Sequence, residues 1–109
     1  MIFIVVKFPV KPEAAEQWPE LVRGYTEATR AEPGNKWFEW SRSLEDPNEY
    51  VLVEAFEDDA AEAHVTSEHF RWATSADGPM VQALAATPRI VSRQVEGDGW
   101  DEMGEMRVG

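Results

Sequence analysis

The fold is decided by two neighbouring stretches, Glu32-Pro33-Gly34-Asn35-Lys36-Trp37-Phe38-Glu39-Trp40-Ser41-Arg42-Ser43 and Tyr50-Val51-Leu52-Val53-Glu54-Ala55-Phe56. Pro33-Gly34 ends a helical pattern, because proline and glycine both disfavour a continuing helix. The residues that follow are rich in aromatic and β-branched side chains, and a short polar turn separates the two runs. Residues 35–44 and 49–57 are therefore predicted to pair as a β-hairpin.

The first strand of this hairpin carries aromatic residues on both faces. Because successive strand residues point to opposite sides, one face is expected to hold Phe38, Trp40 and Leu44, and the other Trp37, Glu39 and Ser41. Aromatic side chains on both faces favour burial on both sides. We expect one face to meet the helices of the same chain and the other to meet a second copy of it.

The flanking segments predict the rest of the fold. Residues 2–8 are apolar and β-branched, which is typical of a buried strand, and residues 87–95 are predicted to form the last strand. From Pro12 a helical pattern runs towards Pro33; Pro19 either kinks it or lies in the first turn of a helix that begins later. The predicted order is β-α-β-β-α-β, the ferredoxin-like or split βαβ arrangement, an α+β fold with an antiparallel sheet.

The second helical region contains both histidines of the chain, His64 and His69. Asp59 and Glu62 have the spacing of a capping box, and the helix is predicted to break near Thr66-Ser67, where Ser67 can cap a second segment. On one continuous helix the two histidines would lie about 140° apart. They also lack the i, i+4 spacing of zinc-binding helices, so no metal site is expected.

Composition narrows the class of partner. The chain has 109 residues, which suits one domain, and 43% of them are hydrophobic. The net charge of -11 disfavours binding to nucleic acids and to anionic membranes. The absence of cysteine excludes disulfides and thiolate chemistry. The short apolar N-terminal run lacks the features of a signal peptide, so a cytoplasmic location is expected.

The C-terminal segment is predicted to behave differently from the rest. Residues 1–96 are expected to form the single domain, and residues 97–109 a tail that begins at a flexible Gly97-Asp98-Gly99 break. The tail contains a tryptophan and two methionines, which are unusual in a free tail. We therefore expect it to pack on a neighbouring subunit; a loosely ordered tail is the alternative.

The hairpin, together with the segment Glu62-Ala63-His64-Val65-Thr66-Ser67-Glu68-His69-Phe70, resembles the antibiotic biosynthesis monooxygenase superfamily. The resemblance covers residues 1 to about 95. It implies a dimeric α+β barrel that oxidises quinol-like aromatic molecules with molecular oxygen and has no bound cofactor. Haem-degrading relatives share the architecture, but their Asn, Trp and His positions correspond here to Lys7, His64 and Thr74, which disfavours haem degradation.

The resemblance also implies where a site would lie. A histidine often stands at the position of His64, which makes it the leading acid–base candidate; imidazole exchanges its proton nearest to neutral pH. A structural hydrogen bond is the alternative role for this residue. Relatives place an Asn and a Trp four residues apart on a strand, as oxyanion donor and stacking wall. Here Asn35 and Trp40 are five apart, so only a bulge would bring them to one face.

Other side chains complete the expected site. The substrate-binding wall is predicted to contain Trp40, Phe38, Phe70, Trp72 and His69. Glu54 interrupts an apolar strand and is a candidate buried base, although an ion pair with Arg42 or an exposed position is the favoured interpretation. The sequence therefore predicts a cofactor-independent monooxygenase. A non-catalytic dimeric binding protein for a small aromatic metabolite is the alternative, because the same pocket would serve both.

Overall fold

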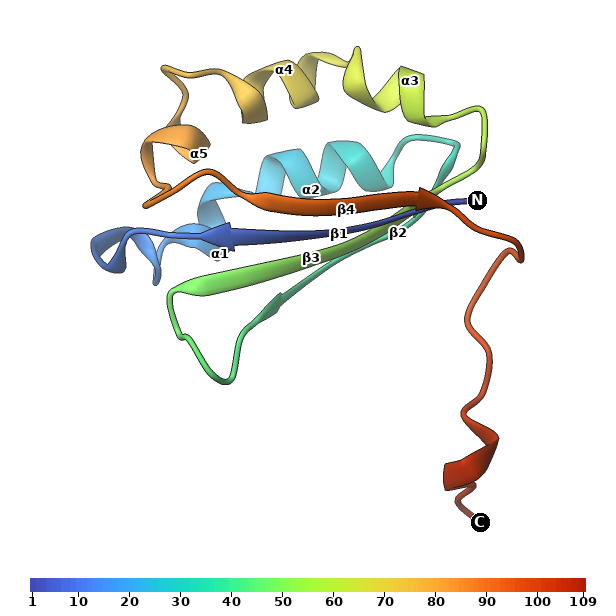
Figure 1. Ribbon diagram of the computed structural model, residues 1–109. Helices are drawn as coiled ribbons and strands as arrows, with labels where there is room; N and C mark the ends of the chain where they lie inside the picture. The colour runs from blue at the N-terminus through green and yellow to red at the C-terminus, as the bar shows by residue number, and fades with distance from the viewer.

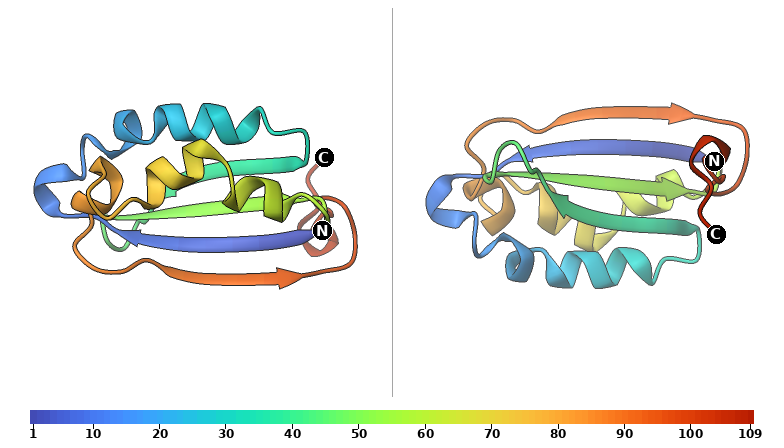
Figure 2. Two further views of the ribbon diagram at one scale, coloured as in Figure 1. Left: turned by 90° about the horizontal axis from the view of Figure 1, so that it is seen from above. Right: turned by 90° about the horizontal axis from the view of Figure 1, so that it is seen from below.

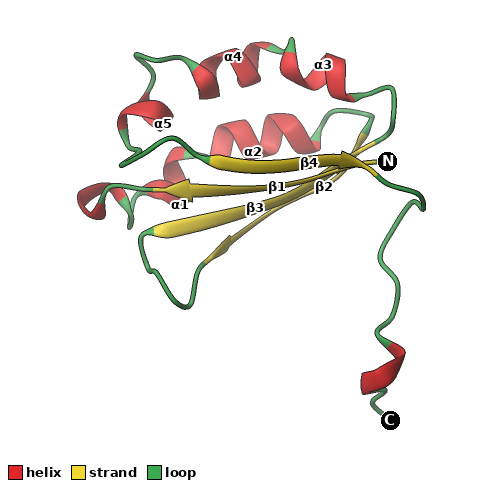
Figure 3. Ribbon diagram, in the orientation of Figure 1, coloured by secondary structure: helices red, strands yellow, loops and turns green.

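The computed structural model describes residues 1–109 as an antiparallel sheet with the helices α2, α3 and α4 on one face (Figures 1 and 3). The strand order is β2-β3-β1-β4, which confirms the predicted α+β, split βαβ architecture. The elements are β1 Ile2–Pro9, η1 Pro12–Ala14, α1 Trp18–Leu21, α2 Arg23–Arg30, β2 Asn35–Arg42, β3 Glu49–Phe56, α3 Ala61–Val65, α4 Glu68–Thr74, α5 Pro79–Gln82, β4 Arg89–Gln94 and η2 Gly104–Met106.

The hairpin pairs β2 with β3 in the predicted way and contains a bulge. Trp40 lies opposite Leu52 and Trp37 opposite Ala55, but Asn35 lies opposite Phe56, so Lys36 is the extra residue. The extra residue shifts the alternation of side chains by one position, so residues an odd number apart across the bulge share a face. Asn35 and Trp40 therefore belong to the same face of the sheet, five residues apart in sequence.

The face of β2 that meets the helices carries Phe38, which is buried, and Trp40, which is half-buried. Trp37 faces the opposite side, as the alternation predicts. Leu44 does not share the buried face, because β2 ends at Arg42 and Leu44 lies fully exposed in the turn. The prediction for Leu44 was wrong because it extended the strand's period beyond the last paired residue.

The first helical region divides at its prolines. Pro12 begins a single 3₁₀ turn, and α1 begins at Trp18 with Pro19 in its first turn, where a missing N–H is tolerated. The second of the two expected arrangements is therefore correct. Buried side chains still follow one stripe across the division, since Trp18, Val22 and Tyr25 all join the core.

The second helical region breaks where the sequence predicts. The Ser67 hydroxyl accepts a hydrogen bond from the Phe70 amide at 3.1 Å and caps α4. The expected capping box was wrong, because α3 starts at Ala61 and has no side-chain cap. The nearby Asp58 instead forms an ion pair with the amino group of Met1 at 2.8 Å. Two short helices with different axes result (Figure 2).

No helix covers the sheet face opposite α2, α3 and α4, and the tail leaves β4 towards that side (Figure 1). Val5 is the centre of a valine row that includes Val53 and Val91 on this face. The Trp100 ring lies 5.1 Å from Trp37, so the start of the tail packs on the same face. No helix combines the length and apolar character that crossing a bilayer requires.

Candidate functional site

A cavity of about 380 Å³ lies between the sheet and the helices α3 and α4. Its floor comes from alternate residues of β1, β3 and β4, and its roof from the two short helices. Most lining side chains are apolar, among them Ile4, Phe8 and Ile90. The only titratable side chains on its wall are Tyr25, Glu54 and His64. A concave apolar site with a few converging polar groups is typical of small-molecule pockets.

His64 is the centre of the polar groups. Its side chain is almost completely buried and packs against Phe56 and Phe70, with ring centroids 4.7 and 5.1 Å away. Its Nδ1 lies 2.8 Å from Glu32 Oε2, and its Nε2 lies 3.3 Å from the Tyr25 hydroxyl. An Nδ1–H donated to the carboxylate leaves the Nε2 lone pair on the pocket side, where it accepts a hydrogen bond from the Tyr25 hydroxyl. This is the tautomer that a proton acceptor needs.

Glu54 extends the polar group on the pocket side. It is 5% exposed, its Oε1 lies 4.0 Å from His64 Nε2, and Oε1 has no hydrogen-bond partner. Burial, followed by the charge of Glu32, raises the pKa of Glu54 to about 7. The same two effects, burial first and then the charges of Glu54 and Glu32, raise the pKa of Tyr25, which keeps its hydroxyl proton.

The favoured sequence interpretation of Glu54 was wrong. Arg42 lies opposite Tyr50 in the hairpin and pairs with Glu16 at 2.9 Å, whereas Glu54 lies opposite Phe38 on the buried face. No cation neutralises Glu54 there. The alternative that the sequence left open, a buried carboxyl group with a raised pKa, describes its position.

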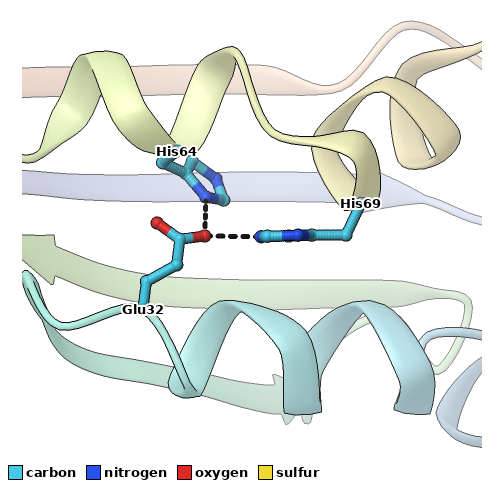
Figure 4. Close-up of side chains that lie close together, drawn as sticks. All are labelled: Glu32, His64 and His69. Atoms are coloured by element: carbon cyan, nitrogen blue, oxygen red, sulfur yellow. Dashed lines mark hydrogen bonds and ion pairs between the residues drawn. The ribbon is translucent and has the colours of Figure 1, made fainter.

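His69 joins the cluster from the other side. Its Nε2 lies 2.5 Å from Glu32 Oε2, so one carboxylate oxygen contacts both imidazoles (Figure 4). The separation of about 140° applies to one continuous helix, and the predicted break at Ser67 turns α4 relative to α3, so the two imidazoles meet at Glu32. His69 does not line the pocket.

The predicted aromatic wall is only partly assembled around this pocket. Phe70 lines it, and Phe38 is buried beneath Tyr25 with ring centroids 5.4 Å apart. Trp72 is 41% exposed and Trp40 lies elsewhere, in an outer hollow of about 220 Å³ beside α1 and α2. The indole N–H of Trp40 donates to the Thr26 hydroxyl at 2.8 Å. This second hollow contains none of the histidines.

Asn35 stabilises the hairpin bulge. Its side-chain amide donates to the carbonyl oxygens of Trp37 and Ala55 at 3.0 and 3.3 Å. An amide nitrogen has two hydrogens, so both are engaged and neither remains for an oxyanion. The bulge brings Asn35 and Trp40 to one face, but it does not bring them to one pocket.

Sequence reasoning missed Tyr25 and Glu32. Tyr25 counted only as one apolar position of a helical stripe, and Glu32 only as part of a helix end. A usable signal existed for Glu32, since a carboxylate just before Pro33-Gly34 lies where the chain turns from helix to strand. Nothing in the local sequence indicates which side chain such a carboxylate will meet.

Comparison with known proteins agrees with this architecture. The family model described as antibiotic biosynthesis monooxygenase matches residues 1–75, so the chain belongs to that family. No curated protein matches the chain.

Solved structures of the same type superpose over most of the chain. A Nitrosomonas europaea protein assigned to these monooxygenases is 28% identical, with a TM-score of 0.73 over 87% of this chain and 98% of that one. A Deinococcus radiodurans protein is 20% identical, with a TM-score of 0.79 over 95% of this chain and 100% of that one. A protein from Caulobacter crescentus is 24% identical, with a TM-score of 0.76 over 87% of this chain and 90% of that one. At these two lower identities the likeness shows the fold alone.

Proposed function

We propose that this protein is a homodimeric monooxygenase that oxidises a quinol- or polyphenol-like aromatic with molecular oxygen and needs no bound cofactor for turnover. The observation that carries the proposal is the apolar pocket on whose wall His64, Glu54 and Tyr25 converge. Membership of the antibiotic biosynthesis monooxygenase family supports a small organic substrate. The apolar lining of the pocket supports a largely apolar substrate.

The substrate itself supplies the electrons in this reaction. A phenol becomes far more electron-rich when it loses its proton, and the phenolate can then reduce triplet oxygen by one electron. Recombination of the two radicals gives a peroxide anion on carbon, which takes up a proton to become a hydroperoxide. For a substrate CH₂ group, loss of water from that hydroperoxide yields a carbonyl, so CH₂ and O₂ become C=O and H₂O and no outside reductant is consumed.

The pocket side chains have separate parts in this scheme. His64 Nε2 accepts the phenolic proton, while Glu32 holds the ring and balances the imidazolium that forms. Glu54, which retains its proton to about pH 7, donates a hydrogen bond to the developing oxyanion and then transfers its proton to the peroxide. The apolar walls keep water away from the carbon radical.

Oxygen consumption tests the proposal directly. Purified protein is incubated with a panel of hydroquinones and anthrones, with and without air, while an oxygen electrode and product analysis follow the reaction. Protein-dependent oxygen uptake with an oxygenated product supports the monooxygenase. Ligand binding without any oxygen uptake would instead support the alternative, a binding protein for an aromatic metabolite.

Replacement of Glu54 by glutamine is expected to lower turnover and raise stability together. Glutamine can still donate a hydrogen bond but cannot release a proton, so turnover should fall about 10-fold or more. The unfolded carboxyl group ionises near its ordinary value of 4.5, whereas the folded one keeps its proton to about pH 7. The contribution of Glu54 to the stability of the wild type is therefore fully present below pH 4.5 and is lost as the pH rises to 7, by up to about 3 kcal/mol.

Denaturant unfolding from pH 4 to pH 8 measures this dependence of stability on pH. The buffer contains EDTA, so that no metal ion contributes to stability. The Glu54→Gln protein should lose the decline between pH 4.5 and 7. Glu62→Gln, which makes the same change at an exposed position on α3, serves as the control. An unchanged pH profile in Glu54→Gln would show that Glu54 does not hold its proton in the fold.

The homodimer is proposed from the uncovered sheet face. The valine row through Val5, with Phe3 and Trp37 beside it, forms an apolar surface that the chain's own helices do not reach. A monomer would leave this surface in water at a cost of about 25 cal/mol per Å². The exposed tail residues Trp100, Met103 and Met106 are available to the same partner.

Val53→Glu is expected to abolish the dimer, because it places a charge at the centre of this face. Light scattering at micromolar concentration should show a shift from dimer to monomer, with a lower melting temperature. Ala76→Glu adds the same charge in an exposed loop on the helix side and should remain dimeric. A stable, folded monomer in the wild type would refute the dimer.

A further inference from the structure

The cluster of Glu32, His64 and His69 brings together three side chains from three separate segments (Figure 4). Glu32 follows α2, His64 belongs to α3, and His69 to the first turn of α4. We propose that Glu32 Oε2, His64 Nδ1 and His69 Nε2 form a binding site for a divalent transition-metal ion such as Zn²⁺, beside the substrate pocket, with which it shares the His64 side chain.

The spacing of the ligand atoms suits such an ion. The three atoms lie within 4.8 Å of one another, with Glu32 Oε2 at 2.8 Å from His64 and 2.5 Å from His69. In a tetrahedral zinc site with bonds of about 2.0–2.2 Å, neighbouring ligand atoms are about 3.3 Å apart. Small side-chain rotations would bring the three atoms to this separation, and water would complete the coordination.

The donor set indicates the type of ion. Two imidazoles and one carboxylate suit Zn²⁺ and Fe²⁺, whereas Ca²⁺ and Mg²⁺ prefer oxygen ligands. The chain's net charge of -11 favours cations in general. The Glu32 and His69 side chains are 14% and 22% exposed, so an ion can reach the cluster from solvent without crossing the pocket.

The surroundings of His64 already contain the partners that a metal-bound imidazole uses. When a metal binds one ring nitrogen, the other carries a proton and usually donates it to a neighbouring oxygen. His64 Nε2 faces the Tyr25 hydroxyl at 3.3 Å and the buried Glu54 Oε1 at 4.0 Å. Glu54 Oε1 is the oxygen without a hydrogen-bond partner. Metal binding at Nδ1 would direct an N–H towards it.

Metal binding would change what His64 offers the pocket. Without an ion, Nδ1 donates its hydrogen to Glu32 and Nε2 presents a lone pair. With an ion on Nδ1, Nε2 carries the hydrogen, so His64 becomes a donor and can no longer accept the phenolic proton. This consequence rests on the proposed function, whereas the binding site itself does not.

Cobalt titration of the EDTA-treated, full-length protein tests the site. Co²⁺ in a low-symmetry nitrogen and oxygen site absorbs visible light, and Zn²⁺ should displace it in a 1:1 ratio. His69→Gln and Glu32→Gln should each weaken zinc binding by about 10-fold or more, as measured by calorimetry. Glu68→Gln, the same charge change at an exposed neighbour of His69, should bind as the wild type does.

The outcomes separate this proposal from the proposed function, because metal binding is measured without any substrate. No visible band, or equal affinities in the wild type and a correctly folded His69→Gln protein, would overturn the site even if turnover is found. If the Glu32→Gln protein does not fold, the zinc affinity of His69→Gln tests the site, because the His69 side chain is more exposed than that of Glu32. Where turnover is present, Zn²⁺ should inhibit the wild type and spare His69→Gln.

Discussion

His64→Ala is expected to lower turnover by about 100-fold or more, the usual contribution of a positioned acid–base group. His64 Nδ1 contacts the Glu32 carboxylate at 2.8 Å, and this contact holds the lone pair of Nε2 towards the pocket. Alanine removes the proton acceptor and leaves substrate deprotonation to water, which the apolar walls exclude. His64→Gln should recover little, because glutamine hydrogen-bonds but does not accept a proton.

The same change will also affect stability, so turnover must be expressed per folded molecule. His64 is buried against Phe56 and Phe70, and alanine leaves a cavity there. Turnover and thermal unfolding are therefore measured on the same samples. A binding protein would show no turnover in any variant and only weaker ligand affinity. Wild-type turnover in a well-folded His64→Ala protein would remove His64 from the chemistry.

Trp18→Ala is expected to cause the largest loss of stability, about 3–5 kcal/mol. Trp18 is completely buried at the start of α1, with its ring centroid 5.5 Å from Phe8 and 5.9 Å from Trp40. Its removal empties the space between α1 and the sheet. Such a loss is a third or more of the stability of many domains, so the melting temperature should fall by more than about 10 °C.

Trp18→Phe is the matched control, because it keeps a ring in the same place. The Trp18 indole N–H has no hydrogen-bond partner, so phenylalanine removes an unsatisfied buried donor while it leaves a smaller cavity. We expect less than about half of the alanine effect. Denaturant unfolding measures both changes. Equal stability of Trp18→Ala and the wild type would mean that α1 does not pack on the sheet as described.

The fold was predictable because its signals are local. Pro33-Gly34, the aromatic strand and the polar turn each act through the backbone preferences of a few consecutive residues. The break at Ser67 was predictable for the same reason, since a serine cap bonds an amide three residues away. Errors arose where a local pattern was not matched by a structural partner. Leu44 lies beyond the last paired residue of β2, and Asp59 makes no side-chain cap for α3.

The candidate site was predictable only in part. His64 followed from the resemblance, and Phe70 from its place in the second helical segment. Trp40 and Asn35 share a face through the bulge, but that face is wide enough for two separate hollows, and the strand pattern alone does not distinguish them. Glu54 was recognised as unusual, yet its partner was misjudged because strand register, which sets Phe38 rather than Arg42 opposite it, is a property of the paired sheet.

The sequence by itself therefore determined the order of elements, the split βαβ topology, the hairpin and the position of His64. Only the tertiary structure decided which side chains contact that histidine. Glu32, His64 and His69 come from three segments, and their side chains meet because α2, α3 and α4 pack on one sheet face. Secondary structure follows from interactions over a few residues, whereas a buried polar cluster depends on how distant segments share one interior, which no local pattern encodes.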